Sequence, residues 1–139
     1  MSSVFVDTTP LFALNSPRDQ YFTKTIKLIK LLSATQLITT DDVINETLTN
    51  LLGAKKGGYR SAINLLEWTF DKSSPIRTEL IDQKRFFAGV RIFRRFNKDK
   101  QWSFTDCTSY VVMKELGIKT VFTFDEHFEQ MGFKLLGKA

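Results

Sequence analysis

The chain has 139 residues, the usual length of one domain that can bury its own core, so we expect a single domain over residues 1–139. Charged residues make up 25% of the sequence and the AVILMFWYC set 42%, which is a soluble globular composition and argues against disorder. The net charge of +5 favours polyanionic partners without identifying one.

Two further classes of protein are excluded by what the sequence lacks. Its apolar stretches are far too short to span a membrane, and residues 1–4 do not begin a signal peptide. We therefore expect a cytoplasmic protein with no membrane partner. The single cysteine, Cys107, excludes an internal disulfide and a Cys-based zinc site, and we expect it to be a small buried hydrophobe.

Strands and helices are expected to alternate along the chain. In chain order, the expected strands cover residues 4–6, 37–39, 77–81, 119–123 and, at an edge of the sheet, 133–136. The expected helices cover a short segment from residue 9 and then residues 19–33, 42–52, 61–70, 83–96 and 103–116. This alternation predicts an α/β fold, with a parallel sheet flanked by helices in an α/β/α sandwich.

Local signals mark where several of these helices begin and end. Pro10 suits the first position of the short helix, and Thr39 with Asp42 has the spacing of a capping box. Ser103 and Asp106 repeat that spacing before the last long helix, which we expect to end at the glycine after residue 116.

Four acidic residues are the best candidates for a functional site. Asp7 and Asp125 each follow an apolar strand, while Glu46 and Asp106 lie in helices after comparable strand or loop exits. Ligands of open α/β sheets bind at the carboxyl edge of the strands, so the four carboxylates could converge there. Crowded carboxylates repel one another unless a cation joins them, and hard oxygen ligands suit Mg²⁺ or Mn²⁺.

Each acid also has a purely structural interpretation. Asp7 and Asp106 could cap helices, and Asp125 could cap the short turn that follows it. Glu46 faces away from the apolar side of its helix and could be only a solvated residue. A repeated sequence pattern favours a functional site, because each of the four acids has a neighbouring threonine that could orient its carboxylate. These threonines are Thr8, Thr47, Thr105 and Thr123.

Residues 84–100 carry seven of the 20 basic residues against one acid. On a helical projection, the basic residues that share one side are Lys84, Arg91, Arg94, Arg95 and Lys98. The other side carries Phe86, Phe93 and Phe96. Such a charge run is usually a solvated face whose aromatic side packs on the core. Beside a carboxylate metal site, a surface that contacts phosphates becomes the more economical interpretation.

Two weaker signals concern partners. Residues 55–60 form a small basic loop with an aromatic ring that could stack on a base. Aromatic residues in the second and fourth helices could form a homodimer face, although packing in the core explains them equally well. These residues are Tyr21, Phe22, Trp68 and Phe70.

Four segments together resemble the acidic motifs of the PIN domain family, in order and at similar spacing. They are VFVDTT at 4–9, VINET at 43–47, SFTDCTS at 103–109 and TFDEHF at 123–128. The resemblance covers nearly the whole chain, and residues 116–133 are its most specific part. Within the family, the sequence is most similar to the single-domain VapC-like toxin ribonucleases.

The resemblance implies a metal-dependent endoribonuclease on a Rossmann-like sheet. The residues it implies for holding Mg²⁺ or Mn²⁺ are Asp7, Glu46, Asp106 and Asp125. It also implies RNA as the substrate and a small antitoxin protein as the partner. The segment from about residue 53 to 100 is where the family varies, so the choice of substrate is not implied.

The chemistry of such a site is phosphodiester hydrolysis. A metal ion can activate water and polarise the phosphate, so no side-chain nucleophile is needed. Thr8, Thr9 and Thr105 are candidate supporting residues, and Thr9 could either bridge a water at the metal or cap the next helix. His127, the one histidine, is interpreted as a surface or packing residue.

Other enzyme classes fit the sequence less well. A haloacid-dehalogenase-type phosphatase needs an acid where Thr9 stands, and a receiver domain needs an acidic pair after its first strand and a lysine after its last. Two alternatives stay open. One is a catalytically silent PIN module that binds RNA or protein, and the other is a housekeeping RNA-processing nuclease instead of a toxin.

Overall fold

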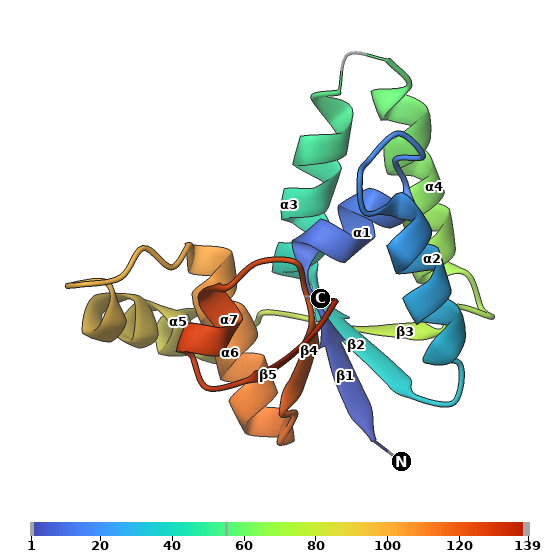
Figure 1. The fold of residues 1–139 in the computed structure, drawn as a ribbon. Helices are drawn as coiled ribbons and strands as arrows, with labels where there is room; N and C mark the ends of the chain where they lie inside the picture. The colour runs from blue at the N-terminus through green and yellow to red at the C-terminus, as the bar shows by residue number, and fades with distance from the viewer. Residues whose placement is uncertain (1, 55, 138–139) are drawn as a thin grey trace.

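The computed structural model describes residues 2–54 and 56–137, and a parallel sheet forms its centre (Figure 1). The strands are β1 (Ser3–Val6), β2 (Gln36–Thr40), β3 (Ile76–Glu79), β4 (Thr120–Phe122) and β5 (Lys134–Leu136). They lie in the order β3-β2-β1-β4-β5, and every neighbouring pair is parallel. The expected strands are confirmed with small shifts at their ends, and β5 does lie at an edge.

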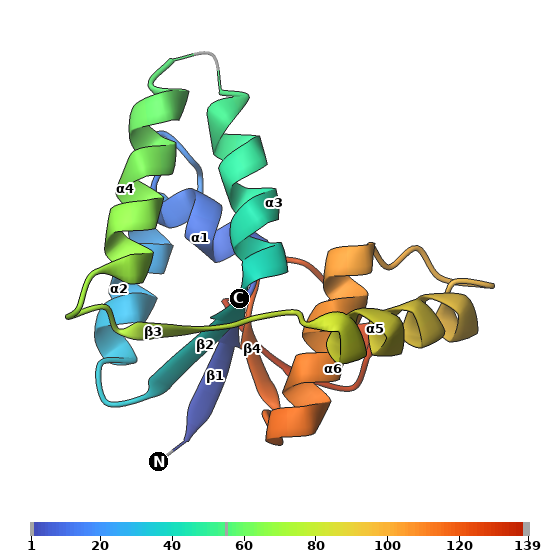
Figure 2. The same cartoon turned by 180° about the vertical axis from the view of Figure 1, so that it is seen from behind.

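Helices cover both faces of this sheet. They are α1 (Thr8–Leu14), α2 (Phe22–Leu31), α3 (Asp41–Leu52), α4 (Gly58–Phe70), α5 (Gln83–Phe96), α6 (Phe104–Leu116) and α7 (His127–Gln130). Figures 1 and 2 show α1 to α4 gathered on one side of the sheet and α5 to α7 on the other. The predicted α/β/α arrangement is therefore confirmed.

The order of the strands reverses direction at β1. From β1 the chain proceeds outward through β2 to β3, and it then returns to the other side of β1 to form β4 and β5. Where connections leave neighbouring strands toward opposite faces of a sheet, a crevice opens at their carboxyl ends. The ends of β1 and β4 are therefore the place where this fold offers a binding site.

The core fills both faces of the central strands because these strands are apolar at nearly every position. Phe5, Val6 and Phe122 are fully buried, as in parallel sheets that are covered on both sides. Cys107 is also fully buried, as expected, and burial raises the pKa of its thiol to about 11. In the described part of the chain, none of the helices has the length and apolar character that a membrane crossing requires.

Two expectations about helix starts are wrong. The cap of α3 is Thr40, whose hydroxyl accepts a hydrogen bond from the Val43 N–H at 3.1 Å. Thr39, the expected cap, belongs to β2 and donates its hydroxyl proton to a carbonyl of β1 at 2.9 Å. Pro10 is the third residue of α1 and not the first, because the helix begins two residues earlier.

Among the other helices, α5 has the predicted ends, whereas α2 and α4 begin at other residues than predicted. The ends of α5 are those predicted. By contrast, α2 begins at Phe22 and not at residue 19, because the Asp19 carboxylate accepts the Tyr21 N–H at 2.8 Å and holds a turn. Since α4 begins at Gly58, the basic segment 55–60 is only partly a loop, and Lys55 lies outside the described residues.

Helix α5 packs on α6 and not on the sheet. The two helices approach so closely that a Cβ atom on Gly89 would stand 2.8 Å from Cγ2 of Thr108. Of the three phenylalanines expected to pack on the core, Phe96 does so, but Phe86 and Phe93 are 44% and 42% exposed. The expectation is wrong for these two, whose rings lie instead against Phe104 of α6, with centroids 5.1 and 6.5 Å from it.

The aromatic residues considered for a homodimer face have different surroundings. Trp68 packs against the core, and Tyr21 stacks on Phe124 with ring centroids 4.0 Å apart. Phe70 is 61% exposed at the end of α4. A homodimer stays a prediction, with Phe70 as exposed apolar surface on that side.

Candidate active site

Asp7 lies directly after β1, at the point where the strand order reverses. Its N–H donates to the Phe122 carbonyl at 3.0 Å, and its Oδ2 accepts the hydroxyl proton of Thr123 at 2.8 Å. The carboxylate does not form the side-chain cap that its position before α1 offers. Burial raises the pKa of Asp7 to about 7, and the nearby Asp106 and Asp125 carboxylates add to the shift. The side chain is thus held where a negative charge is costly.

Asp106 enters the same area from the first turn of α6. It forms the predicted capping box, in which the Ser103 N–H donates to Asp106 Oδ2 at 3.0 Å and the Asp106 N–H donates to Ser103 Oγ at 3.0 Å. Asp106 is nevertheless only 7% exposed, and burial raises its pKa. Its other oxygen, Oδ1, has no hydrogen-bond partner among residues 2–54 and 56–137. The structural interpretation is therefore confirmed, and it leaves one carboxylate oxygen available.

Asp125 completes a chain of polar contacts across the ends of β1 and β4. Its N–H donates to Thr123 Oγ1 at 3.0 Å, and its Oδ1 accepts the His127 N–H at 2.9 Å, so it does cap the following turn. The ring of His127 stands between two acids, with Nδ1 3.0 Å from Asp106 Oδ2 and 3.5 Å from Asp125 Oδ1. His127 therefore contacts the acidic cluster, a contact that its interpretation as a surface or packing residue did not foresee.

Glu46 lies farther along α3, one turn beyond a second acid that sequence reasoning missed. Asp42 accepts the Thr108 hydroxyl proton at 2.8 Å, which joins α3 to α6. Burial raises the pKa of Asp42, and the neighbouring Asp41 and Glu46 carboxylates add to it. The i, i+4 spacing of Asp42 and Glu46 was the available signal, because it places both acids on one face of a helix.

The structure thus links three of the four predicted acids through shared polar contacts, but it does not place their carboxylates within reach of a single metal ion. Asp7, Asp106 and Asp125 are connected through Thr123 and His127, whereas Glu46 stays on the adjacent helix beside Asp42. Among the residues that the structure describes, no three His, Cys, Asp or Glu side chains are close enough together to hold a metal ion.

The family is decided by a match over most of the chain. The model of the PIN domain family matches residues 4–134. The chain belongs to this family. The resemblance read from the four acidic motifs is confirmed.

Two relatives give the family assignment more detail. This PIN domain is 28% identical over 134 residues to the 23S rRNA-specific endonuclease VapC20 of Mycobacterium tuberculosis, across 94% of this chain and 95% of VapC20. The crystal structure of VapC20, a sarcin-ricin loop cleaving toxin, matches with a TM-score of 0.81 and 27% identity, over 94% of this chain and 95% of that one. FitAcB from Neisseria gonorrhoeae shares the fold, with a TM-score of 0.68 and 16% identity over 96% of each chain.

The threonines of this PIN domain differ in what they do. Thr123, expected to orient its neighbour Asp125, accepts the Asp125 N–H but donates its hydroxyl proton to Asp7. Thr47 donates back to a carbonyl of its own helix at 2.7 Å. Thr9 accepts the Phe124 N–H at 3.0 Å and ties α1 to the segment after β4. The Thr8 hydroxyl is buried and has no partner in the described part of the chain. Thr105 offers only its backbone carbonyl, which accepts from Thr108 at 3.2 Å.

The predicted basic residues stand on the solvent side of α5 and just beyond its end. They are Lys84, Arg91, Arg94, Arg95 and Lys98, and all five are exposed. Within residues 2–54 and 56–137, none of them forms an ion pair. Arg85 differs, because its guanidinium bridges Glu79 and Glu115 at 3.0 Å each, and these bonds raise its pKa. Arg85 therefore stabilises the fold through its ion pairs, whereas the other arginines of α5 have none in the described part of the chain and can bind an anion.

Proposed function

We propose that this PIN domain is a metal-dependent endoribonuclease, the toxin of a toxin–antitoxin pair. The observation that carries the proposal is the state of Asp7, a buried carboxyl with two further carboxyls beside it at the carboxyl end of the sheet. Burial together with like charges raises its pKa to about 7, so without a cation the ionised form of Asp7 is poorly stabilised near neutral pH. A divalent cation would supply that help, and VapC20 supports the choice of reaction.

The donor set suits a hard cation. The residues proposed to hold Mg²⁺ or Mn²⁺ are Asp7, Asp106, Asp125 and Glu46, whose carboxylate oxygens suit these ions but would have to move closer together around one. Two atoms lack partners among the described residues, namely Asp106 Oδ1 and the buried Thr8 hydroxyl, and both belong to the acidic motifs. When bound, the metal would polarise a phosphate oxygen and help water to attack near neutral pH.

The chain's own residues would prepare this site in three ways. Thr123 donates to Asp7 and accepts from the Asp125 N–H, so it fixes the spacing of the first and last acids. His127 contacts Asp106 and Asp125 and balances their charge when it is protonated. Asp42 and Glu46 add negative charge from α3, which strengthens the attraction for a cation.

RNA would be held by the unpaired cations of α5. Lysine and arginine bind phosphates by releasing counterions, and the sequence-independent part of RNA affinity comes from such contacts. We assign this role to Lys84, Arg91, Arg94, Arg95 and Lys98. A small antitoxin protein is the partner proposed for a toxin of this kind, since a cell that makes it must restrain it.

The test is cleavage of structured and unstructured RNA by the purified chain, with Mg²⁺, with Mn²⁺ and with excess EDTA. We expect cleavage with either metal and none with EDTA, and the cut sites are then mapped. Asp99→Asn, a matched change at an exposed acid, should cut like the wild type. Full activity in EDTA would exclude the metal mechanism, and binding without cleavage under every condition would identify a silent PIN module.

A second experiment separates a toxin from a housekeeping nuclease. The wild-type chain and an Asp7→Asn variant are each produced in growing cells under an inducible promoter. A toxin should arrest growth only when Asp7 is intact, and coproduction of a small protein from the neighbouring gene should prevent the arrest. Normal growth with active enzyme would favour the housekeeping function.

A further inference from the structure

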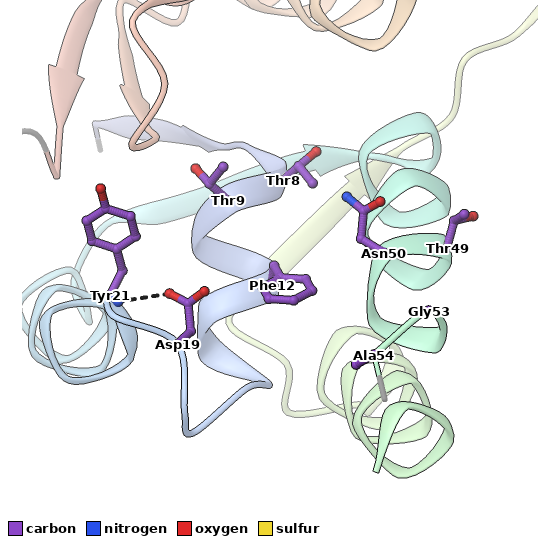
Figure 3. A pocket seen from close by; sticks show the side chains of 9 residues that line it. All are labelled: Thr8, Thr9, Phe12, Asp19, Tyr21, Thr49, Asn50, Gly53 and Ala54. Atoms are coloured by element: carbon purple, nitrogen blue, oxygen red, sulfur yellow. Dashed lines mark hydrogen bonds between the residues drawn. The ribbon is translucent and has the colours of Figure 1, made fainter. Parts of the chain in front are cut away.

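A cleft next to the acidic cluster has no part in the hydrolysis described above. Figure 3 shows it between α1, the turn before α2 and the end of α3. Its volume is about 570 Å³, within the range of small-molecule sites in proteins. The residues that line it are Thr8, Thr9, Phe12, Asp19, Tyr21, Thr49, Asn50, Gly53 and Ala54. Because Thr8 follows Asp7 directly, the cleft begins where the acidic cluster ends.

The middle of the cleft is aromatic. Phe12 of α1 lies in it, half-buried, with its ring facing the open space in Figure 3. Tyr21 forms part of the wall, and its ring is held by stacking on Phe124 at 4.0 Å with 9° between the planes. A flat ligand can therefore meet an aromatic ring there without a rearrangement of the wall.

Polar groups stand on two sides of this ring. Asp19 Oδ1 accepts the Tyr21 N–H at 2.8 Å, which fixes the carboxylate, and Oδ2 has no partner within residues 2–54 and 56–137. The Asn50 amide, on the other side of Phe12 in Figure 3, likewise has none in the described chain. Thr49 is not available, since its hydroxyl donates to the Asn45 carbonyl at 3.0 Å. The free groups are thus one carboxylate oxygen and one amide.

We infer that this cleft takes an unpaired guanine base of the substrate RNA, from a nucleotide next to the cut. The inference rests on the proposed function. A negatively charged carboxylate repels phosphate, so Asp19 selects for the base and not for the backbone. Unpaired bases are recognised by stacking on aromatic rings and by hydrogen bonds to their edges, which is what the cleft provides.

Guanine is the base whose edge fits these groups. A carboxylate only accepts hydrogen bonds, and guanine presents two neighbouring donors, N1–H and the N2 amine, for it. Uracil has a single N–H between two carbonyl oxygens, which the carboxylate would repel. Adenine and cytosine each offer one amine beside a bare ring nitrogen. The Asn50 amide can donate to the acceptors O6 or N7 of guanine.

The competing explanation is that Asp19 only holds the turn before α2. Asparagine keeps an oxygen that accepts the Tyr21 N–H, so Asp19→Asn should preserve the turn. It also replaces the second acceptor with a donor, which guanine N1–H and N2 amine cannot use. The substitution therefore separates the role in the turn from recognition of a base.

The experiment measures kcat/KM on short single-stranded RNAs that carry guanine, inosine, adenine or uracil at each nucleotide beside the mapped cut. Inosine lacks the N2 amine and is otherwise shaped like guanine. We expect the wild type to prefer guanine over inosine about tenfold at one of these positions, the effect of one hydrogen bond to a charged group. Asp19→Asn should bring the ratio close to one, and Asp99→Asn should leave it unchanged. A ratio that Asp19→Asn does not alter overturns the inference.

Binding gives a readout that does not depend on cleavage. Fluorescence anisotropy of labelled guanine and inosine RNAs is measured on an Asp7→Asn background, with and without Asp19→Asn, after thermal unfolding has shown that both variants fold. A preference for guanine that only Asp19→Asn removes would support the cleft even if the wild type cuts no RNA, in which case the proposed function alone fails. If Asp19→Asn does not fold, Asn50→Ala at the exposed opposite wall replaces it and should reduce the preference for guanine over adenine RNA, because adenine lacks the O6 acceptor whereas inosine keeps it. Equal binding of the two RNAs by folded Asp7→Asn protein overturns the inference.

Discussion

The acidic cluster and the basic side of α5 are organised in opposite ways. Thr123 donates to Asp7, which is distant in the sequence, at 2.8 Å, and accepts from Asp125, two residues away, at 3.0 Å. On α5, Arg91 and Arg95 are exposed, with no ion pair in the described part of the chain. The acids proposed for catalysis are held by hydrogen bonds within the fold, while Arg91 and Arg95, proposed to attract RNA, have no ion pair in the described residues, although Arg95 lies over the Phe96 ring at 5.2 Å.

Arg85 shows that the difference concerns partners and not residue type. It lies on the same helix as Arg91, yet it is bound to Glu79 and Glu115 and is largely covered. An arginine with internal acids contributes to packing between α5, β3 and α6, whereas one without them remains available to phosphate. Substitutions in the acidic cluster should therefore change the rate of RNA cleavage, whereas substitutions on the basic side of α5 should change RNA affinity.

The largest effect is expected from Asp7→Asn. Removing this charge should lower the rate of RNA cleavage by on the order of a hundredfold or more, because electrostatic groups at the reacting phosphate supply much of the rate enhancement. RNA affinity should change little, since the α5 cations are intact. Cleavage rates and anisotropy titrations on the same protein check both points. A variant that cuts at the wild-type rate would remove Asp7 from the site.

The next effect is expected on RNA affinity. Reversal of Arg91 and Arg95 to Glu should weaken binding about equally for all RNA sequences, and the salt dependence should flatten by roughly 0.7 per lost phosphate contact. Arg85→Gln is the matched control, and it should lower thermal stability without this change in salt dependence. If the double reversal leaves RNA affinity unchanged, the α5 surface is better assigned to an acidic segment of a partner protein.

A smaller effect is expected in the pH dependence of stability. The pKa of Asp7 rises from 3.8 to about 7 on folding, so its contribution is complete below about pH 3.8 and is lost as the pH rises toward 7. The metal-free protein should therefore lose on the order of a few kcal/mol of unfolding free energy across this window. Denaturant titrations at several pH values measure it. Asp7→Asn should reduce the slope, and an unchanged slope would contradict the assignment to Asp7.

The smallest effect is expected on the stability of Asp106→Asn without metal. Asparagine can still accept the Ser103 N–H, and it removes one of several neighbouring negative charges, so unfolding free energy should change by less than about 1 kcal/mol. Cleavage should nevertheless collapse. Ser103→Ala is the converse control, and it should cost about 1 kcal/mol as a lost cap while cleavage persists. A destabilised Asp106→Asn protein that still cuts RNA would show that Asp106 is only a cap.

Much of the fold could be read from the sequence because its signals are local. The apolar runs predicted the strands, and α5 was placed from the periodicity of its basic and aromatic residues. The capping box of Ser103 and Asp106 was also predictable, since both partners lie within one helical turn. The error at α3 is instructive, because Thr39 and Thr40 are both acceptable caps until β2 packs beside β1 and the Thr39 hydroxyl donates to a carbonyl of β1.

The residues themselves determined the order of strands and helices, the PIN family and the identity of the four acids. Only the tertiary structure decided that Thr123 joins Asp7 to Asp125, that His127 stands between two acids and that Asp42 reaches Thr108. The same holds for the cleft, whose walls come from α1, α3 and the turn before α2. The physical reason is sequence distance: helix periods and caps act within a few residues, whereas these contacts exist only after the sheet has brought the ends of β1 and β4 together.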